Sequence, residues 1–146
     1  MVIEIQISSL DQTDFTIVEG TFNYNNQFYN NLNAKNLLKN YSINKTKKIL
    51  NSLNGNFAVI LKRHNNIFIA VDHVRSKPLF YAIRDQSIIV SSNAYWIKKK
   101  LNKFCYNSNA FLELWYFLYC LNDNTLIEEI KQLEAGTYLS GKFAKG

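Results

Sequence analysis

The first thirty residues alternate between apolar and polar side chains, with Ile3, Ile5 and Ile7 on one face of the opening segment. Such alternation is typical of a strand with one buried face. Glu19-Gly20 and Asn25-Asn26 are turn-prone pairs that separate the later segments. The pattern therefore predicts short strands joined by tight turns over residues 2–7, 15–18, 21–24 and 27–29.

The apolar period changes between Leu32 and Leu53, where large apolar residues recur at helical spacing. This spacing predicts helices, because residues three and four positions apart lie on one helix face. Ser42 and Asn44 are residue types that cap helix N-termini, and both lie in the middle of the segment. We therefore expect two short helices.

Strand patterns return after Asn54-Gly55, with continuous apolar runs at Phe57–Leu61 and Ile67–Val71. Two more strands are predicted at 78–83 and 88–91. We predict an antiparallel meander of these four strands, with its two central members buried on both faces. A sheet buried on both faces needs a second layer against each of them.

The end of the chain changes back to a mainly helical pattern. The elements predicted there are helices at 94–101, 109–121 and 126–131 and a last strand at 137–139. The sequence has no internal repeat and no low-complexity linker. We therefore expect a single domain over 1–146, with the sheet and short helices in 1–91 and the helical part with the last strand in 92–146.

The composition indicates a globular protein, because 47% of the 146 residues are hydrophobic and 14% are aromatic. No apolar run approaches the roughly 20 residues that span a bilayer, and the first residues lack a signal-peptide pattern. We expect a soluble cytoplasmic protein without a membrane partner. Cys105 and Cys120 lack the paired spacing of zinc sites, so we expect two buried free thiols.

The formal net charge of +6 raises the question of nucleic-acid binding, because clustered lysines neutralise phosphates. The basic residues are dispersed except for two groups, at 45–48 and 98–100, and both groups lie on amphipathic stretches. A solvated polar face explains such groups. The chain is also rich in Asn, Lys, Ile and Tyr throughout, which indicates a general compositional bias. Nucleic-acid binding is therefore kept only as an alternative.

Four short blocks within residues 53–139 have recognisable patterns. Leu53–Ala58 has the form Leu-x-Gly-x-Phe-Ala, and Asp72–Tyr81 is similar to an Arg-Asp-x-x-Gly-x-Lys-Pro-Leu-Tyr-Tyr loop. Ser91–Ala94 stands where an Ala-Ser-Glu stretch begins a helix, and Thr125–Leu139 is similar to Thr-Leu-x-x-x-Ile-x-x-Leu-x-Pro-Gly-x-Tyr-Leu. In this order the blocks resemble the N-terminal glutamine-hydrolysing domain of the asparagine synthetase family.

The resemblance singles out one loop, with the residues Asp72, Arg75, Lys77 and Pro78. Asp72 matches the aspartate of the family pattern, whereas Val71 stands at its arginine and Ser76 is assigned to its glycine. Arg75 then occupies a position without a role in the pattern. We interpret Asp72 and Arg75 as residues that order the loop, with a catalytic role as the alternative.

The resemblance implies an α+β fold, a four-layer αββα sandwich of two antiparallel sheets, which is the fold of N-terminal-nucleophile hydrolases. This chain would be shortened at its N-terminus, because few residues precede the family-like segment Tyr24–Asn30. The family has several strands and a substrate-binding arginine loop in that interval. A Gly-Ser-Asp segment that could hold the glutamine α-amine is also missing between Asn30 and Leu53.

The nucleophile of such enzymes is an N-terminal cysteine whose own α-amine serves as the base. Residue 2 here is Val2, which has no thiol or hydroxyl group. Cys105 and Cys120 cannot replace the nucleophile, because their α-amines are consumed in peptide bonds. We therefore expect no glutaminase activity and no catalytic residue in this chain.

A second family feature is the pair Asn-Gly, which stabilises the tetrahedral oxyanion. Tyr24–Asn30 is similar to the motif Phe-Asn-Gly-Glu-Ile-Tyr-Asn, which places Asn25 at the oxyanion asparagine. Asn26 then stands at the glycine and Gln27 at the glutamate. We interpret the three residues as a vestigial oxyanion and glutamine site. The alternative is a plain Asn-Asn hairpin in an Asn-rich protein.

An apolar stripe at helical spacing is formed by Phe111, Leu114, Trp115 and Leu118. Core packing is the usual role of such a stripe. In the larger synthetases this region lies near the ATP-using domain, so exposed aromatic residues would instead form a docking surface. The residues of this possible docking surface are Trp115, Tyr116 and Tyr119. His64 and His73 are too few for a metal site, and we expect none.

The resemblance leads to one main functional hypothesis. The chain would be a catalytically disabled glutamine amidotransferase-like domain that supports an asparagine-synthetase-like enzyme forming an amide or lactam. It would carry no cofactor, and ATP and Mg²⁺ would belong to a partner domain or subunit, with a homodimer as another possible assembly. The alternatives are a stand-alone module that binds an amino acid or amide, and a basic nucleic-acid-binding domain.

Overall fold

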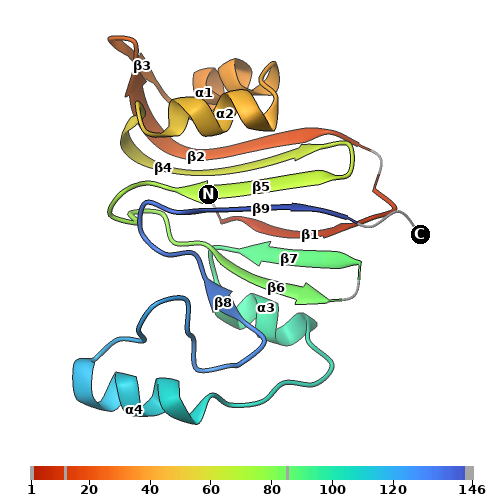
Figure 1. The fold of residues 1–146 in the computed structure, drawn as a ribbon, viewed down its shortest axis with the longest axis vertical. Helices are drawn as coiled ribbons and strands as arrows, with labels where there is room; N and C mark the ends of the chain where they lie inside the picture. The colour runs from red at the N-terminus through yellow and green to blue at the C-terminus, as the bar shows by residue number, and fades with distance from the viewer. Residues whose placement is uncertain (1, 12, 85, 144–146) are drawn as a thin grey trace. The chain divides into compact units, whose positions relative to one another are not determined.

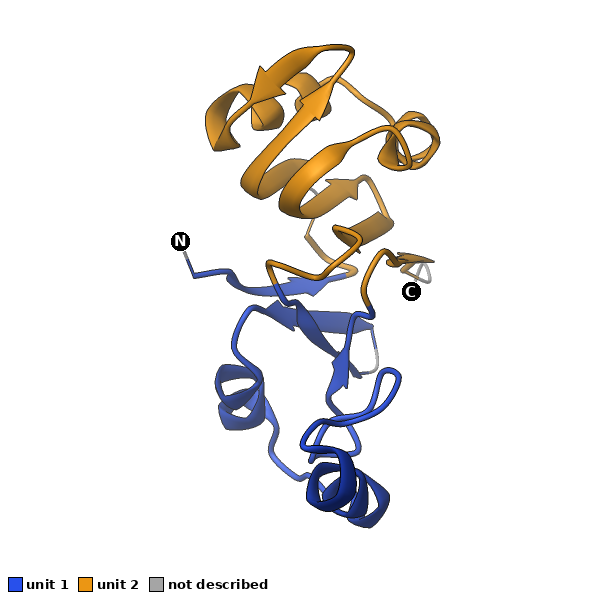
Figure 2. Ribbon diagram, turned by 90° about the vertical axis from the view of Figure 1, so that its left-hand side faces the viewer, with its two compact units in different colours: residues 1–8, 78–134 blue, residues 9–77, 135–146 orange. Residues whose placement is uncertain are grey.

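The computed structural model describes residues 2–11, 13–84 and 86–143. Four helices and nine strands are assigned in these residues (Figure 1). The chain folds into two compact units, unit 1 from residues 1–8 and 78–134 and unit 2 from residues 9–77 and 135–146 (Figure 2). Each unit contains one antiparallel sheet. No helix in the described residues is long and apolar enough to cross a membrane.

Unit 2 is built on a five-stranded sheet with the strand order β3-β2-β4-β5-β9. Its strands are β2 Phe15–Tyr24, β3 Gln27–Tyr29, β4 Asn54–Arg63, β5 Asn66–Val71 and β9 Tyr138–Lys142. The two continuous apolar runs are confirmed as β4 and β5. All residues from Phe57 to Lys62 are buried, so both faces of β4 are covered.

Two helices pack on this sheet, as the change of apolar period predicts. They are α1 Asn31–Lys39 and α2 Ile43–Leu50. The Asn30 side chain caps α1, and the Ser42 hydroxyl caps α2 by accepting from the Lys45 backbone N–H. Leu38 and Ile49 are buried in one core with apolar residues of β2, β4 and β5. The helices therefore cover one face of the unit 2 sheet.

The turn predicted at Glu19-Gly20 is wrong, because β2 runs through both residues and pairs with β4 from Phe15 to Asn23. Gly20 has a φ of +103°, and a Cβ atom there would lie 1.9 Å from the carbonyl oxygen of Asn56. Its backbone N–H donates to the Asn31 side chain at 2.6 Å. The glycine thus allows two backbones to approach closely inside a sheet instead of reversing the chain.

Unit 1 has a four-stranded sheet with the order β1-β7-β6-β8. Its elements are β1 Glu4–Ser8, β6 Phe80–Arg84, β7 Ser87–Ser91, β8 Lys131–Gln132, α3 Ala94–Lys100 and α4 Ser108–Phe117. The helix predicted at 94–101 is confirmed as α3. Ile97 of α3 packs with Ala82 of β6 and Ile89 of β7 in a second core.

The four-stranded meander predicted over 57–91 is wrong. The pairs β4–β5 and β6–β7 both form, but they belong to different sheets. β5 pairs with β9 from the end of the chain, and β7 pairs with β1 from its start. Alternation identifies strands but not their distant partners. The α+β class with two antiparallel sheets is nevertheless confirmed.

The segment after α3 also differs from its prediction. α4 ends at Phe117 because Leu118 has left-handed backbone geometry, with a φ of +63°. The helix predicted at 126–131 is wrong, since Ile127 forms a β-bridge with Tyr106 and β8 follows. The Thr125 hydroxyl donates to the carbonyl oxygens in this segment, at Ile127 and Ile130. Side chain to backbone bonds of this kind compete with helix formation.

The prediction of two buried thiols is also wrong for Cys105, which is exposed, while Cys120 is half-buried. Cys105 lies outside the helices, and its backbone N–H donates to the Glu129 carboxylate at 3.0 Å. Burial raises the pKa of Cys120, and the negative charge of Glu113 raises it further. Both thiols are free.

Replacing Gly20 tests the close approach of β2 and β4. The Gly20→Ala variant is expected to lower the free energy of unfolding by at least about 2 kcal/mol, because its Cβ atom collides with backbone at a positive φ. Urea denaturation at constant m-value measures the change. Gly141→Ala is the matched control, since its Cβ would contact only Ile67, at 3.9 Å, and we expect a change within about 1 kcal/mol. Equal stability of the two variants would contradict this account of Gly20.

Candidate functional site

The Asp72 carboxylate lies at the end of β5 and is 1% exposed. It accepts hydrogen bonds from the backbone N–H groups of Phe57 at 3.1 Å, Val74 at 3.0 Å and Ser76 at 3.1 Å. The Ser76 hydroxyl donates a further bond at 2.5 Å. Both carboxylate oxygens therefore bind the loop and β4, and the buried charge is satisfied inside unit 2.

The backbone of Asp72 makes further connections. Its N–H donates to the Phe57 carbonyl at 3.0 Å, and its carbonyl accepts from Arg75 at 3.0 Å and from Gly136 at 2.8 Å. Phe57, the 72–77 loop and Gly136 come from three of the four sequence blocks that carry the family resemblance. The structure thus brings these three blocks together around one residue.

The loop geometry corrects the assignment of the family glycine to Ser76. Arg75 has a φ of +52°, which is the left-handed region that favours glycine. Counting back from Lys77-Pro78, the glycine of the pattern Arg-Asp-x-x-Gly-x-Lys-Pro also falls on Arg75. Arg75 therefore stands at the glycine position. Ser76 instead supplies two of the donors to Asp72.

The pKa of Asp72 reflects two opposing effects. Burial is the largest one and raises the pKa, but the bonds from Ser76, Val74 and Phe57 together lower it below its ordinary value. The ionised carboxylate is thus the form that the folded loop holds.

A small cavity of about 200 Å³ adjoins this loop. Lys47, His73 and Thr137 contribute polar groups to its lining, together with Asp72. Lys77 is half-buried at the end of the loop in unit 2, and Pro78 begins the segment of unit 1 that leads into β6. In the described residues, no group of three or more His, Cys, Asp and Glu side chains could hold a metal ion.

Asn25 and Asn26 form the two-residue turn between β2 and β3, with φ values of +49° and +61°. Positive φ at both positions is the signature of a type I′ hairpin, for which Asn is well suited. Both side chains are exposed, as is Gln27, whose side-chain oxygen accepts from the Tyr29 hydroxyl at 2.8 Å. The hairpin and the Asp72 loop belong to unit 2, whereas Val2 is an exposed residue of unit 1.

The interpretation of the helical stripe as part of the core is wrong, because α4 buries only Ala110. We call the exposed apolar residues of α4 and of the two positions that follow it the α4 surface: Phe111, Leu112, Leu114, Trp115, Tyr116, Phe117, Leu118 and Tyr119. Trp115 is 82% exposed and Tyr116 74%. Glu113 is the residue that faces the following loop, where it accepts from Leu121 at 2.9 Å and Asn124 at 3.2 Å. The three residues predicted for docking are therefore all exposed.

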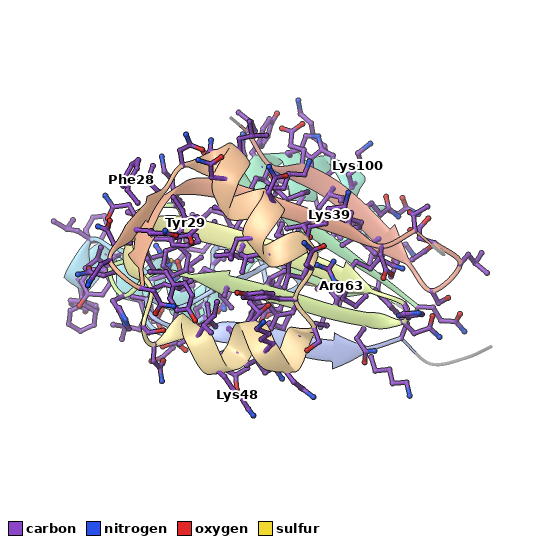
Figure 3. All side chains as sticks on the ribbon, turned by 90° about the horizontal axis from the view of Figure 1, so that it is seen from above. Phe28, Tyr29, Lys39, Lys48, Arg63 and Lys100 are labelled. Carbon is purple, nitrogen blue, oxygen red and sulfur yellow. The ribbon has the colours of Figure 1, made fainter. Side chains whose placement is uncertain are left out.

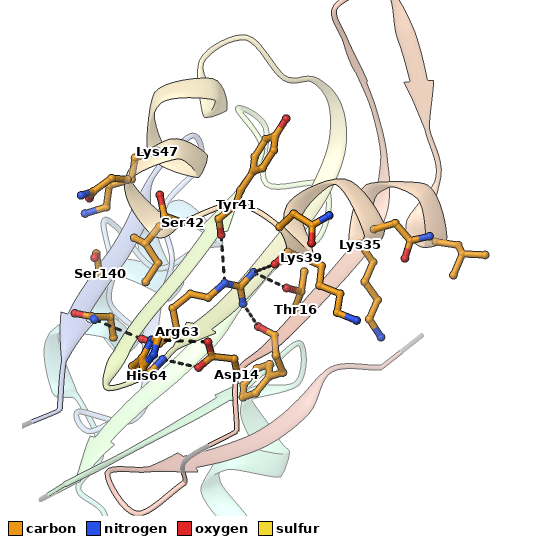
Figure 4. A pocket seen from close by; sticks show the side chains of 17 residues that line it. Asp14, Thr16, Lys35, Lys39, Tyr41, Ser42, Lys47, Arg63, His64 and Ser140 are labelled. Atoms are coloured by element: carbon orange, nitrogen blue, oxygen red, sulfur yellow. Dashed lines mark hydrogen bonds and ion pairs between the residues drawn. The ribbon is translucent and has the colours of Figure 1, made fainter.

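A larger groove, which the sequence did not reveal, lies beside the C-terminal end of α1. Figure 3 shows two residues of its lining, Lys39 and Arg63, near one another. The volume of the groove is about 1050 Å³, and Lys35, Lys39, Lys47 and Arg63 contribute to its lining (Figure 4). One feature of the sequence relates to this groove. Arg63 follows the buried run of β4, which places its charged side chain next to the core. The lysines come from α1 and α2 and meet only through the tertiary fold.

Replacing Asp72 tests its role in the loop. Asp72→Asn is expected to destabilise the fold by about 3 kcal/mol, because buried N–H donors lose a charged acceptor, and Ser76→Ala by about 1.5 kcal/mol. The lowered pKa of Asp72 means that its stabilisation is complete above the ordinary carboxyl pKa and is lost as the pH falls through the folded value. The difference between wild type and Asp72→Asn should therefore shrink below about pH 4. Urea titrations at several pH values measure it, and a pH-independent difference would contradict the role of the ionised carboxylate.

Comparison of the sequence with known protein families gives information that does not depend on the structure. Residues 17–145 match a family model described as a glutamine amidotransferase domain. No curated protein matches the chain. The matched range includes the Asn25 hairpin, the Asp72 loop and α4, and it covers most of the 146 residues. The chain therefore belongs to the glutamine amidotransferase domain family.

Proposed function

We propose that this chain is a glutamine amidotransferase-like domain that does not hydrolyse glutamine and that supports an asparagine-synthetase-like, ATP-dependent enzyme forming an amide or lactam. The observation that carries the proposal is the α4 surface. Eight large apolar residues lie exposed within nine consecutive positions of unit 1. A partner that covers them would remove this apolar area from water.

The size of the α4 surface supports a protein partner. At roughly 150–250 Å² per aromatic side chain, its five aromatic residues leave roughly 600 Å² exposed, and its three leucines add to this area. A standard protein interface buries about 800 Å² on each partner. The α4 surface is therefore large enough for a specific interface.

The chemistry of the α4 surface also resembles that of an interface centre. Such centres are rich in Trp, Tyr and Phe and poor in charged residues. Glu113 is the only charged residue of α4, and its carboxylate is engaged by Leu121 and Asn124. Trp115, Tyr116 and Tyr119 combine a large apolar area with a polar group at the tip, which suits residues that anchor an interface.

The proposed partner is the ATP-using domain or subunit of an asparagine-synthetase-like enzyme. That partner would bind ATP and Mg²⁺, and this chain would contribute no cofactor. The four-layer αββα sandwich and a cytoplasmic location are parts of the same proposal. A second copy of the chain is the other partner that the uncharged α4 surface could accept.

The lack of glutaminase activity rests on the nucleophile. The family resemblance requires a cysteine whose own α-amine serves as the base. Cys105 and Cys120 follow the Asn25 hairpin by many residues, and neither has a free α-amine. The Asn25 and Asn26 side chains are exposed at the tip of a hairpin, where a developing oxyanion would be solvated by water rather than by fixed donors.

The α4 surface can be tested by polar substitutions four residues apart. Trp115→Ser combined with Tyr119→Ser is expected to weaken binding to a synthetase-like protein bearing a Ser-Gly-Gly-x-Asp-Ser loop by at least about tenfold, because aromatic anchors dominate interface energies. Co-purification and calorimetry measure binding. Phe28→Ser is the matched control, since Phe28 is an aromatic residue of β3 that is 65% exposed.

Binding that survives the double substitution would contradict this docking surface. Sedimentation of the isolated chain separates the two possible partners. Dimerisation that disappears in the double variant would assign the surface to a second copy instead of a synthetase.

The catalytic proposal predicts that the purified chain releases ammonia from glutamine no faster than buffer alone. The physical reason is the missing thiol with a free α-amine. A coupled glutamate dehydrogenase assay measures the release, with an active glutamine amidotransferase as the positive control. Turnover by the wild-type chain that persists in a variant lacking both cysteines would contradict the proposal most directly, because it would require another nucleophile.

A further inference from the structure

The groove beside α1 has an excess of positive charge. Lys35 and Lys39 are four residues apart on α1, so they lie on one face of the helix. Lys47 comes from α2, and Figure 4 shows it on the other side of Arg63. Within the described part of the chain, neither Lys35 nor Lys39 forms an ion pair. Their ammonium groups are therefore available to a ligand.

Arg63 prevents the end of α1 from cancelling this charge. Its guanidinium group donates to the carbonyl oxygens of Leu38 at 2.9 Å, Lys39 at 3.1 Å and Tyr41 at 3.2 Å, as well as to the Thr16 hydroxyl at 2.9 Å. A helix C-terminus carries partial negative charge that repels anions. Because Arg63 neutralises it, the lysines face a site without a competing negative pole.

The carboxylate in the groove lining is already engaged. Asp14 accepts from the His64 backbone N–H at 2.5 Å, and its other oxygen lies 3.9 Å from the His64 ring nitrogen Nδ1. The negative charge of Asp14 also attracts the guanidinium group of Arg63. The lining thus offers three lysines and one arginine against a single acid.

The net charge of unit 2 as a whole also favours the binding of anions. The sequence of unit 2 holds eleven Lys and Arg residues against four Asp and Glu residues, whereas that of unit 1 has nearly equal numbers. Such an imbalance attracts anions from a distance. The net charge of the chain is therefore a property of the unit that contains the groove.

The remaining lining indicates what kind of anion would fit. Asn36, Asn40 and Asn44 supply side-chain amides that can donate and accept hydrogen bonds. The volume of about 1050 Å³ is at the upper end for small-molecule sites. Single-stranded nucleic acids need exposed aromatic faces for stacking. The aromatic residues of the lining are Phe15, which is half-buried, and Tyr41, whose ring is covered by the Lys45 ammonium at 3.7 Å.

We propose that the groove lined by Lys35, Lys39 and Lys47 is a binding site for a small phosphorylated molecule with several negative charges, of the nucleoside polyphosphate class. Lys35 and Lys39 bind the phosphate oxygens, Lys47 adds to the positive charge of the lining, and the asparagine amides bind the polar groups of the remaining part. This site does not depend on the proposed role of α4, which belongs to the other unit.

The test uses the full chain and two probes, ATP without Mg²⁺ and inorganic triphosphate, in isothermal titration at about 150 mM NaCl. We expect saturable 1:1 binding of ATP, and a loss of affinity of at least about tenfold in Lys35→Glu combined with Lys39→Glu, because two attractive charges become repulsive. Lys99→Glu combined with Lys100→Glu is the matched control, since it changes the net charge equally on α3 of unit 1. Its affinity should stay within about twofold of wild type.

Several results would overturn the proposal. These are the absence of saturable binding, equal weakening in both double variants, and tight binding of single-stranded nucleic acid with ATP left unbound. Unfolding midpoints check that the variants fold. If the α1 variant does not fold, amide chemical shifts decide the question, because ATP should perturb Asn36, Ser42 and Asn44 of the wild-type chain. Perturbations confined to unit 1 would count against the groove.

Discussion

The buried carboxylate of Asp72 is the interaction on which unit 2 depends. A charge at this depth is tolerated only when its oxygens are fully hydrogen-bonded, and here β4 and the following loop supply all the donors. The backbone of the same residue then holds Gly136, which leads into β9. The side chain and the backbone of one residue thus fix where β5 ends and where the chain enters the last strand of the sheet.

Much of this fold could be predicted from local patterns. The buried strands β4 and β5 and the capped helices α1 and α2 follow from apolar period and cap residues, both of which act over a few positions. The partners of β5 and β7 could not be predicted, because β9 and β1 lie at opposite ends of the chain. Gly20 is a related case. Glycine is common both in turns and where two backbones approach closely, and only the paired strand distinguishes the two.

The candidate site was predictable in part, for different physical reasons. Asp72 stood out because its loop resembles a known pattern, but the left-handed conformation of Arg75 is hidden when an ordinary residue occupies a glycine position. The stripe of α4 has the same appearance whether it packs in a core or on a partner, since both environments favour the same residues. The groove could not be predicted, because Lys35 and Lys47 lie on different helices that only the tertiary fold brings together.

These contrasts separate the residues that maintain the fold from those that can act on something else. The oxygens of Asp72 are fully occupied within the protein, so a family pattern centred on Asp72 reports the architecture rather than an activity. The lysines of the groove have no partner charge in the described structure, and the aromatic residues of α4 remain between 45% and 82% exposed. Unsatisfied charge and uncovered apolar area are the two conditions that binding relieves. In this domain the residues of the family patterns stabilise the fold. The residues that bind a ligand or a partner are therefore expected among those whose charge or apolar area the fold leaves uncovered.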